Sequence, residues 1–213
     1  GMGGNDTHTL IKEIESSFLE NATAILSASP YYNKPSQEGI FQHYKEVAKV
    51  SPLPVILYNV PGRTGRNMTS ATTLRLAHEV ESIAGIKEAS CDMIQCMEIL
   101  KDKPKDFLVV SGDDMLALPQ LACGMDGVIS VVANCYPKQF SDMVRFGLNQ
   151  NFVEAKKIND FLLPAYNYLF SENNPAGVKA FLYEMNLIKN ELRLPGVAVE
   201  KALQEAIKKF VSA

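Results

Sequence analysis

Five short runs of aliphatic and branched residues recur along the first two thirds of the chain. Their limits are Ala24 to Ser29, Val55 to Asn59, Ile83 to Lys87, Phe107 to Ser111 and Gly127 to Val132. Segments with helical periodicity lie between the early runs. Runs that alternate with helices in this way are typical of βαβ units and of a parallel sheet. The nearly continuous apolar character of the runs predicts strands that are covered on both faces.

Two of the intervening segments show a helical face. Ile40, Tyr44, Val47 and Val50 share one face of the first of these segments. The second segment has a less pure face, made of Leu74, Ala77, His78 and Glu81. Both spacings predict amphipathic helices that pack against the sheet.

The last third of the chain is predicted to be helical. Three sets of residues keep helical spacing there: Phe152, Ala155, Ile158 and Phe161, then Val178, Phe181, Leu182 and Met185, then Val199, Leu203, Ile207 and Phe210. Pro175 and Pro195 lie at the joins, whereas Pro164 lies inside the first helix and is expected to kink it. Three or four helices are therefore expected to close the chain.

The first residues resemble a loop that leads into a helix. Asn5 or Asp6 is a suitable N-cap, and the buried face of the helix would carry Leu10, Ile11, Ile14 and Phe18. Such a loop normally follows a strand, so the chain is expected to begin partway through an α/β architecture.

Composition narrows the classes of function. With 213 residues the chain can form one large domain or two small ones, and a hydrophobic content of 46% is enough for a core. A net charge of -3 argues against nucleic acid as the main partner. No apolar stretch approaches the roughly 20 residues of a membrane helix, and no signal peptide is recognisable. The four cysteines include no Cys-x-x-Cys pair, so reduced, mostly buried thiols in a cytoplasmic protein are expected. The spacing of the four cysteines and three histidines predicts no metal site.

Polar groups follow the ends of the apolar runs. In parallel α/β folds the carboxyl ends of the strands lie at one face, where chemistry collects. Lys87, Tyr58 and Arg63 would bring an amine, a phenol and a guanidinium to that face. A desolvated lysine attacks carbonyl carbons, a phenol moves protons, and a guanidinium holds a carboxylate. Taken singly, each group also has an ordinary structural explanation, such as a solvated lysine at a strand end or a simple turn.

Five motifs, in order, resemble the dihydrodipicolinate synthase family. They are Tyr31–Gly39 (YYNKPSQEG), Tyr58–Gly65 (YNVPGRTG), Gly85–Ala89 (GIKEA), Ser111–Asp114 (SGDD) and Gly127–Val131 (GVISV). The family consists of pyruvate-dependent class I aldolases built on a (β/α)₈ barrel. The resemblance extends into the terminal helices and implies an α/β TIM-barrel fold with a C-terminal helical extension.

The resemblance implies a role for each strand-end group. Lys87 would form a Schiff base with pyruvate, Tyr58 would relay protons above it, and Arg63 would grip the carboxylate of aspartate semialdehyde. The product would be 4-hydroxy-tetrahydrodipicolinate, on the route to diaminopimelate and lysine. The imine itself would serve as electron sink, so no metal or dissociable cofactor is implied.

Further family positions fall on residues around this trio. Tyr32 would reach across a subunit interface into a neighbouring site, which implies a homo-oligomer, either a dimer or a tetramer. Gly112 and Ile129 would contribute main-chain groups and shape near the pyruvate. Tyr31 and Asn5 match part of the family's inhibitor site, although feedback inhibition is not expected.

The resemblance also predicts how the chain is organised. Residues 1–135 would form a partial barrel with strands equivalent to the fourth through the eighth, and residues 136–213 a closing helix and a helical region. The first three strands of the barrel would be lacking, since a full barrel needs about 250 residues. The family's Gly-Thr-Thr-Gly-Glu motif does not occur in this sequence.

The sequence also allows two other functions. The chain could be a catalytically impaired family member that persists as a non-enzymatic oligomer, because the missing motif carries a hydroxyl of the proton relay. It could also be a related pyruvate aldolase such as N-acetylneuraminate lyase. The Gly-Arg-Thr-Gly segment around Arg63 favours the synthase over that relative.

Overall fold

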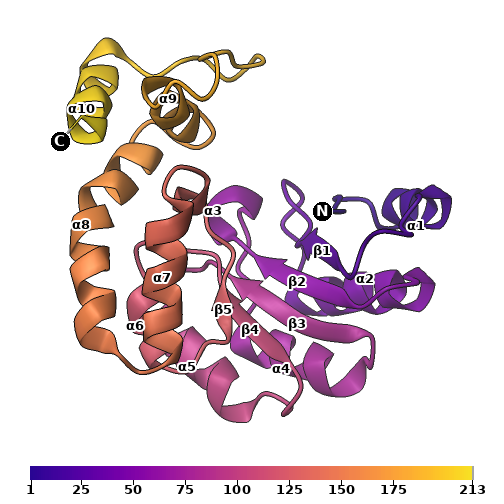
Figure 1. Cartoon of the computed structure of the whole chain (residues 1–213). Helices are drawn as coiled ribbons and strands as arrows, with labels where there is room; N and C mark the ends of the chain where they lie inside the picture. The colour runs from indigo at the N-terminus through magenta and orange to yellow at the C-terminus, as the bar shows by residue number, and fades with distance from the viewer. Residues whose placement is uncertain (213) are drawn as a thin grey trace. The chain divides into compact units, whose positions relative to one another are not determined.

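The structure is a computed structural model that describes residues 1–212. It contains a parallel five-stranded sheet in the order β1-β2-β3-β4-β5 (Figure 1). The strands are β1 (Ile25–Ala28), β2 (Val55–Asn59), β3 (Ile83–Glu88), β4 (Leu108–Ser111) and β5 (Gly127–Val128). Sequential strands that pair in parallel, with helices between them, confirm the predicted α/β class.

Helices follow the strands and then fill the last part of the chain. They are α1 (Thr7–Ser16), α2 (Gln37–Val50), α3 (Pro61–Thr64), α4 (Ser70–Glu79), α5 (Met93–Asp102), α6 (Ala117–Ala122), α7 (Pro137–Leu148), α8 (Phe152–Phe170), α9 (Ala176–Glu184) and α10 (Lys201–Val211). Two compact units result. The first contains residues 1–113 and 123–129, and the second contains residues 114–122 and those from 130 onward.

The fifth strand is shorter than the apolar run predicted. It ends at Val128, and Val132 instead begins the short 3₁₀ helix η1 (Val132–Asn134). Asp114 explains the difference, because its carboxylate accepts hydrogen bonds from the amides of Val131 (3.1 Å) and Val132 (2.8 Å). Amides that donate to a side chain cannot donate to a neighbouring strand, so the ladder stops.

Burial alternates along the strands of the first unit. On β2, Leu57 and Asn59 are buried whereas Tyr58 between them is only partly buried. On β3, Ile86 is likewise buried and Lys87 is partly buried. The buried side chains pack with α2, α4 and α5, which together form the core of this unit. These helices cover one face of the sheet, and most side chains on the other face are partly buried, so the expectation of strands covered on both faces is met in full for one face only.

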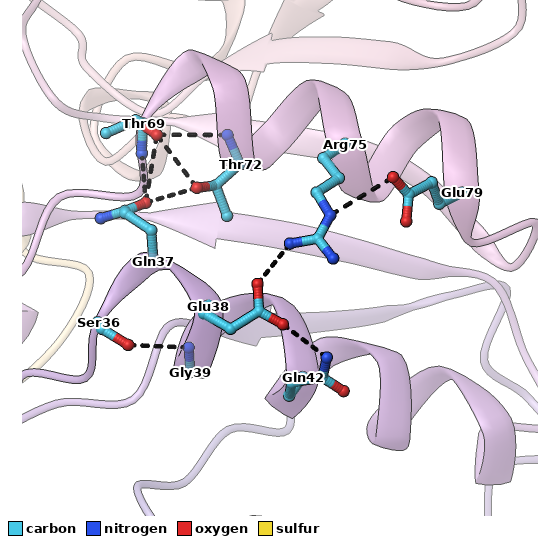
Figure 2. Close-up of polar contacts among 9 residues, drawn as sticks. All are labelled: Ser36, Gln37, Glu38, Gly39, Gln42, Thr69, Thr72, Arg75 and Glu79. Carbon is cyan, nitrogen blue, oxygen red and sulfur yellow. Dashed lines mark hydrogen bonds and ion pairs between the residues drawn. The ribbon is translucent and has the colours of Figure 1, made fainter.

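The buried face of α4 also differs from the prediction. Thr72, Thr73 and Leu76 are buried, rather than the leucine, alanine, histidine and glutamate that the spacing suggested. Figure 2 shows why Thr72 can point inward: its hydroxyl donates to Oε1 of Gln37 on α2 at 2.7 Å. A partner on another helix satisfies the buried hydroxyl, and hydrophobic periodicity does not report such a partner.

Helix α1 starts where the sequence indicated. Asp6 is its N-cap and accepts a hydrogen bond from the amide of Thr9 at 2.7 Å. Leu10 and Ile14 are buried as predicted, whereas Phe18 is 77% exposed. The helix ends at Ser16, so Phe18 no longer follows the helical period that placed it on the buried face.

His43 on α2 makes the first unit sensitive to acid. The side chain is 4% exposed, and burial lowers its pKa from 6.5 to about 4. Nδ1 lies 2.8 Å from Oγ1 of Thr7, and Nε2 is buried without a hydrogen-bond partner. Between these two pKa values the unfolded chain binds a proton that the folded chain excludes. The fold should therefore lose about 3 kcal/mol as the pH falls from above 6.5 to 4.

Urea unfolding of the wild type and His43→Gln at pH 7 and pH 4 measures this loss. The variant is expected to show a weaker dependence on pH, while His8→Gln, at an exposed histidine, should keep the wild-type dependence. Equal pH dependence in His43→Gln and the wild type would contradict the assignment.

Aromatic rings hold the second unit together. Phe210 of α10 lies 5.8 Å from the ring of Phe161 on α8 and 6.1 Å from that of Phe181 on α9. Its ring also lies 6.1 Å from that of Tyr136. Three of the predicted helical faces therefore meet at one residue, and Pro164 lies inside α8 as predicted. Among residues 1–212, no helix has both the length and the apolar character needed to cross a bilayer.

Candidate active site

Tyr58 and Lys87 stand next to each other on adjacent strands. They are direct partners in the register of β2 and β3, so their side chains leave the same face of the sheet. The Lys87 Nζ lies over the Tyr58 ring, 4.4 Å from its centroid. The predicted amine and phenol are thus brought together on the face that the helices of the first unit leave partly exposed.

Gly112 lies directly beside the Lys87 side chain. Its amide, just beyond β4, donates to the carbonyl of Glu88 at 2.7 Å. A Cβ atom built on Gly112 would lie 2.8 Å from both Cε of Lys87 and Cβ of Ala89, closer than real Cβ contacts allow. The glycine therefore leaves the space that the methylene chain of Lys87 occupies.

Gly112→Ala is expected to displace the lysine amine and to slow its reaction with a carbonyl compound by about 10-fold or more, because misplacement of a reacting group by about 1 Å is costly. The measurement is the rate at which pyruvate and borohydride label Lys87. Gly62→Ala is a matched control, because a Cβ atom there meets nothing within 4 Å. Labelling of Gly112→Ala at the wild-type rate would contradict the steric argument.

Ile129 directly follows β5, the strand next to β4. Its amide donates to the carbonyl of Ser111 at 2.8 Å, so its backbone lies beside the Ser111–Gly112 segment. The side chain is 41% exposed. Main-chain groups of two neighbouring strand ends therefore lie beside each other, and the roles of Gly112 and Ile129 near pyruvate stay predictions.

The segment after β2 presents Arg63. Pro61 occupies the start of the short helix α3, and Gly65 ends it with a left-handed backbone (φ 76°). A proline at the first turn and a glycine at the end are the residues that such a helix favours. Burial raises the pKa of the Tyr58 phenol, and the charge of Arg63 acts in the opposite direction. Tyr58 therefore keeps its proton at neutral pH within the field of the guanidinium.

The structure does not bring Tyr32 to the lysine. Its side chain is 88% exposed and its backbone is left-handed (φ 71°). Tyr31 and Asn5 line a different cavity of about 280 Å³, together with Thr9 and Glu13. Of the residues predicted for the site, Tyr58, Lys87, Gly112 and Ile129 thus form one group, and Tyr31 and Asn5 form another.

Sequence analysis missed a buried polar cluster behind the site. Glu88 is fully buried and accepts hydrogen bonds from Nδ2 of Asn59 (3.0 Å), Nε2 of Gln95 (3.0 Å) and the amide of Ser90 (2.6 Å). Burial raises the pKa of Glu88, and these donors oppose that shift. The alternation of side chains along a strand could have indicated the cluster, since the residue after an inward lysine must face the helices.

Comparison with known proteins identifies the family of the chain. The model of the Dihydrodipicolinate synthetase family matches residues 1–213. The chain belongs to this family. The 4-hydroxy-tetrahydrodipicolinate synthase of Flavobacterium psychrophilum is 48% identical over 99% of this chain and 72% of its own length. The enzyme of the same name from Cytophaga hutchinsonii is 47% identical over all of this chain and 70% of its own length.

Solved structures of family members share the fold. The dihydrodipicolinate synthase of Thermotoga maritima superposes with a TM-score of 0.96 at 38% identity, over 100% of this chain and 73% of that one. The enzyme from Acinetobacter baumannii, solved with pyruvate, gives a TM-score of 0.94 at 38% identity, over 100% of this chain and 72% of that one. The predicted fold class, that of the TIM-barrel synthases of this family, is thereby confirmed.

Proposed function

We propose that this member of the dihydrodipicolinate synthetase family condenses pyruvate with aspartate semialdehyde to give 4-hydroxy-tetrahydrodipicolinate, a step of diaminopimelate and lysine biosynthesis. The observation that carries the proposal is the Lys87 amine lying 4.4 Å from the centroid of the Tyr58 ring on the adjacent strand. Synthases with this activity in their names, at 48% and 47% identity, support it.

The chemistry follows from these two side chains. The neutral Lys87 amine attacks the carbonyl carbon of pyruvate, and loss of water leaves an imine. The imine withdraws electrons from the adjacent methyl group, which loses a proton and becomes an enamine. The enamine carbon then attacks the aldehyde carbon of the second substrate, whose oxygen takes up a proton. The amino group of the added substrate finally replaces the lysine nitrogen at the imine carbon, which closes the ring and frees the Lys87 amine. Tyr58, whose burial raises its pKa, supplies and recovers protons in these steps. The imine is the electron sink, so the proposal requires no cofactor.

The surrounding residues would bind the substrates. Arg63 would hold the carboxylate of aspartate semialdehyde through paired N–H donors. The main chain at Gly112 and Ile129 would shape the pyruvate site. The exposed Tyr32 would enter the site of a second copy, in a cytoplasmic dimer or tetramer, and Tyr31 and Asn5 would line a separate effector cavity.

Incubation of the purified chain with pyruvate and borohydride tests the proposal. Reduction of the imine should add the mass of one pyruvyl group at Lys87, located by peptide mass spectrometry. A folded sample that gains no adduct would refute the aldolase mechanism. That result would favour the non-enzymatic oligomer, for which the absence of a Gly-Thr-Thr-Gly-Glu motif from the sequence is the specific observation.

Substrate choice needs a second assay. Aspartate semialdehyde and N-acetylmannosamine, the aldehyde partner of an N-acetylneuraminate lyase, should be offered separately to the pyruvate-loaded protein. Turnover with aspartate semialdehyde alone is expected, since a guanidinium at position 63 suits a carboxylate-bearing aldehyde. Preference for the amino sugar would overturn the specificity that we propose.

A further inference from the structure

Resting on the proposed function, we propose that Glu88 and Gln37 are positioning residues at the two ends of one polar network, which is buried at Glu88 and partly buried at Gln37. Glu88 would fix the Lys87–Tyr58 pair for imine formation, and Gln37 would fix the segment that carries Arg63 for binding of the aldehyde. Neither residue touches the reacting atoms, so each would act through the groups that it holds.

The Glu88 end lies directly behind the catalytic pair. Asn59 and Glu88 are partners in the β2–β3 register, one residue beyond Tyr58 and Lys87. Nδ2 of Asn59 lies 3.2 Å and 3.0 Å from the two carboxylate oxygens of Glu88. This side-chain bridge joins the two strands on the helix-covered face, at the point where the catalytic side chains leave the opposite face. A change in the bridge therefore alters how Lys87 and Tyr58 are aligned.

Asn67 connects the two ends of the network. Its Oδ1 accepts from Nδ2 of Asn59 at 2.8 Å, and its Nδ2 donates to Oε1 of Gln95 at 2.8 Å. The carbonyl of Asn67 accepts from Nε2 of Gln37, also at 2.8 Å. Asn67, which directly follows residues 60–66 around Arg63, is thus tied both to the strand ends and to helix α2.

The Gln37 end anchors the far side of that segment. Oε1 of Gln37 accepts from the amide of Thr69 (3.1 Å) and from the hydroxyls of Thr69 (3.2 Å) and Thr72 (2.7 Å), as Figure 2 shows. Residues 60–66 therefore run between two fixed points, Asn59 at the end of β2 and the 67–69 stretch that Gln37 holds. Arg63 sits in the middle of this span, so both anchors hold the backbone that carries its guanidinium.

The chemistry of the cluster explains why a carboxylate is needed at position 88. All the partners of Glu88 described above, Asn59, Gln95 and Ser90, present N–H groups to it. A glutamine has the same shape but would turn its own N–H group toward at least one of these donors. Two buried N–H donors that face each other are left without an acceptor, and each then carries its full desolvation penalty. The bridge between Asn59 and residue 88 would therefore open.

Kinetics of the full chain can separate the role of Glu88 from that of Gln37. Glu88→Gln is expected to slow borohydride-trapped imine formation about 10-fold or more, with little change in the KM for pyruvate. Glu88→Asp keeps an acceptor-only side chain and should recover part of the rate. Gln37→Leu should leave imine formation at the wild-type rate and raise the KM for aspartate semialdehyde about fivefold or more.

Arg75→Ala is the matched control for Gln37→Leu. Arg75 joins the same two helices through its 2.5 Å contact with Glu38, outside the polar network (Figure 2). Arg75→Ala should change neither the rate of imine formation nor the KM for aspartate semialdehyde. Thermal unfolding of each variant shows whether a change in rate merely follows a loss of stability.

The outcomes distinguish the inference from the proposed function. A wild-type chain without an adduct would refute the proposed function itself. If the wild type forms the adduct and Glu88→Gln forms it equally fast, Glu88 has no positioning role. The inference would also be overturned if Glu88→Gln and Gln37→Leu each impaired both imine formation and binding of aspartate semialdehyde in proportion to their loss of stability. A purely structural network predicts that result. Should Glu88→Gln fail to fold, Glu88→Asp and Gln37→Leu still decide the matter.

Discussion

Lys87→Ala is expected to abolish the pyruvate adduct and to lower the rate of condensation by roughly three orders of magnitude or more. The reason is chemical, since no imine and no enamine can form without the amine. The described structure offers no comparable substitute at that position: the strand partners of Lys87 are Tyr58 on β2 and Val110 on β4. Intact mass after borohydride treatment, together with steady-state turnover, measures both effects.

A matched lysine controls for the loss of charge in this experiment. Lys101 on α5 has an 80% exposed side chain, and Lys101→Ala should keep both the adduct and the turnover. An adduct that persists in Lys87→Ala would place the Schiff base on another lysine and refute the assignment.

Tyr58→Phe is expected to lower kcat by about 10²- to 10⁴-fold while the pyruvate adduct still forms slowly, because general acid–base catalysis contributes about that much. The ring that lies beneath the Lys87 amine is retained, and only the hydroxyl is lost. Burial raises the pKa of Tyr58 above its usual value of 10, so the wild-type phenol stays protonated through neutral pH. Pre-steady-state trapping separates the slow proton transfers from binding of pyruvate.

Tyr166→Phe tests whether loss of a buried hydroxyl alone has this effect. Tyr166 is fully buried in the second unit, and its hydroxyl donates to Oδ1 of Asn159 at 3.3 Å. That variant should lose about 1 kcal/mol of stability at most and keep the wild-type kcat. A Tyr58→Phe variant that turns over at the wild-type rate would remove Tyr58 from the proton relay.

The sequence was sufficient to predict five parallel strands and to place Lys87 and Tyr58 at the same strand-end face. Both residues end apolar runs, and parallel strands bring such ends together. The polar partners of the buried elements were not predictable in the same way. Thr72 is buried because Gln37, 35 residues away, receives its hydroxyl hydrogen bond, and Val132 leaves the strand because Asp114, 18 residues away, captures its amide. Contacts of this kind leave no periodic trace in the local sequence.

The residues of the candidate site also differ in how far the local sequence predicts them. Lys87, Tyr58 and Arg63 follow from residue type and place, whereas Glu88 was read only as part of a motif. Its burial depends on Asn59 and Gln95, which come from a neighbouring strand and a later helix. Alternation along the strand gives its direction, but the three-dimensional arrangement is needed to identify its donors.

The alternating burial of the sheet has a consequence for laboratory evolution. Leu57 and Ile86 lie on the helix-covered face, where truncation to alanine would cost about 2–5 kcal/mol. Ile56, two residues before Tyr58 on β2, and Val110, the β4 partner of Lys87, point to the other, partly exposed face. Libraries that vary Ile56 and Val110 can therefore be screened for new aldehyde substrates with only a small loss of folding stability. Selection for a new carbonyl acceptor should accumulate its changes on this face and leave the buried one untouched.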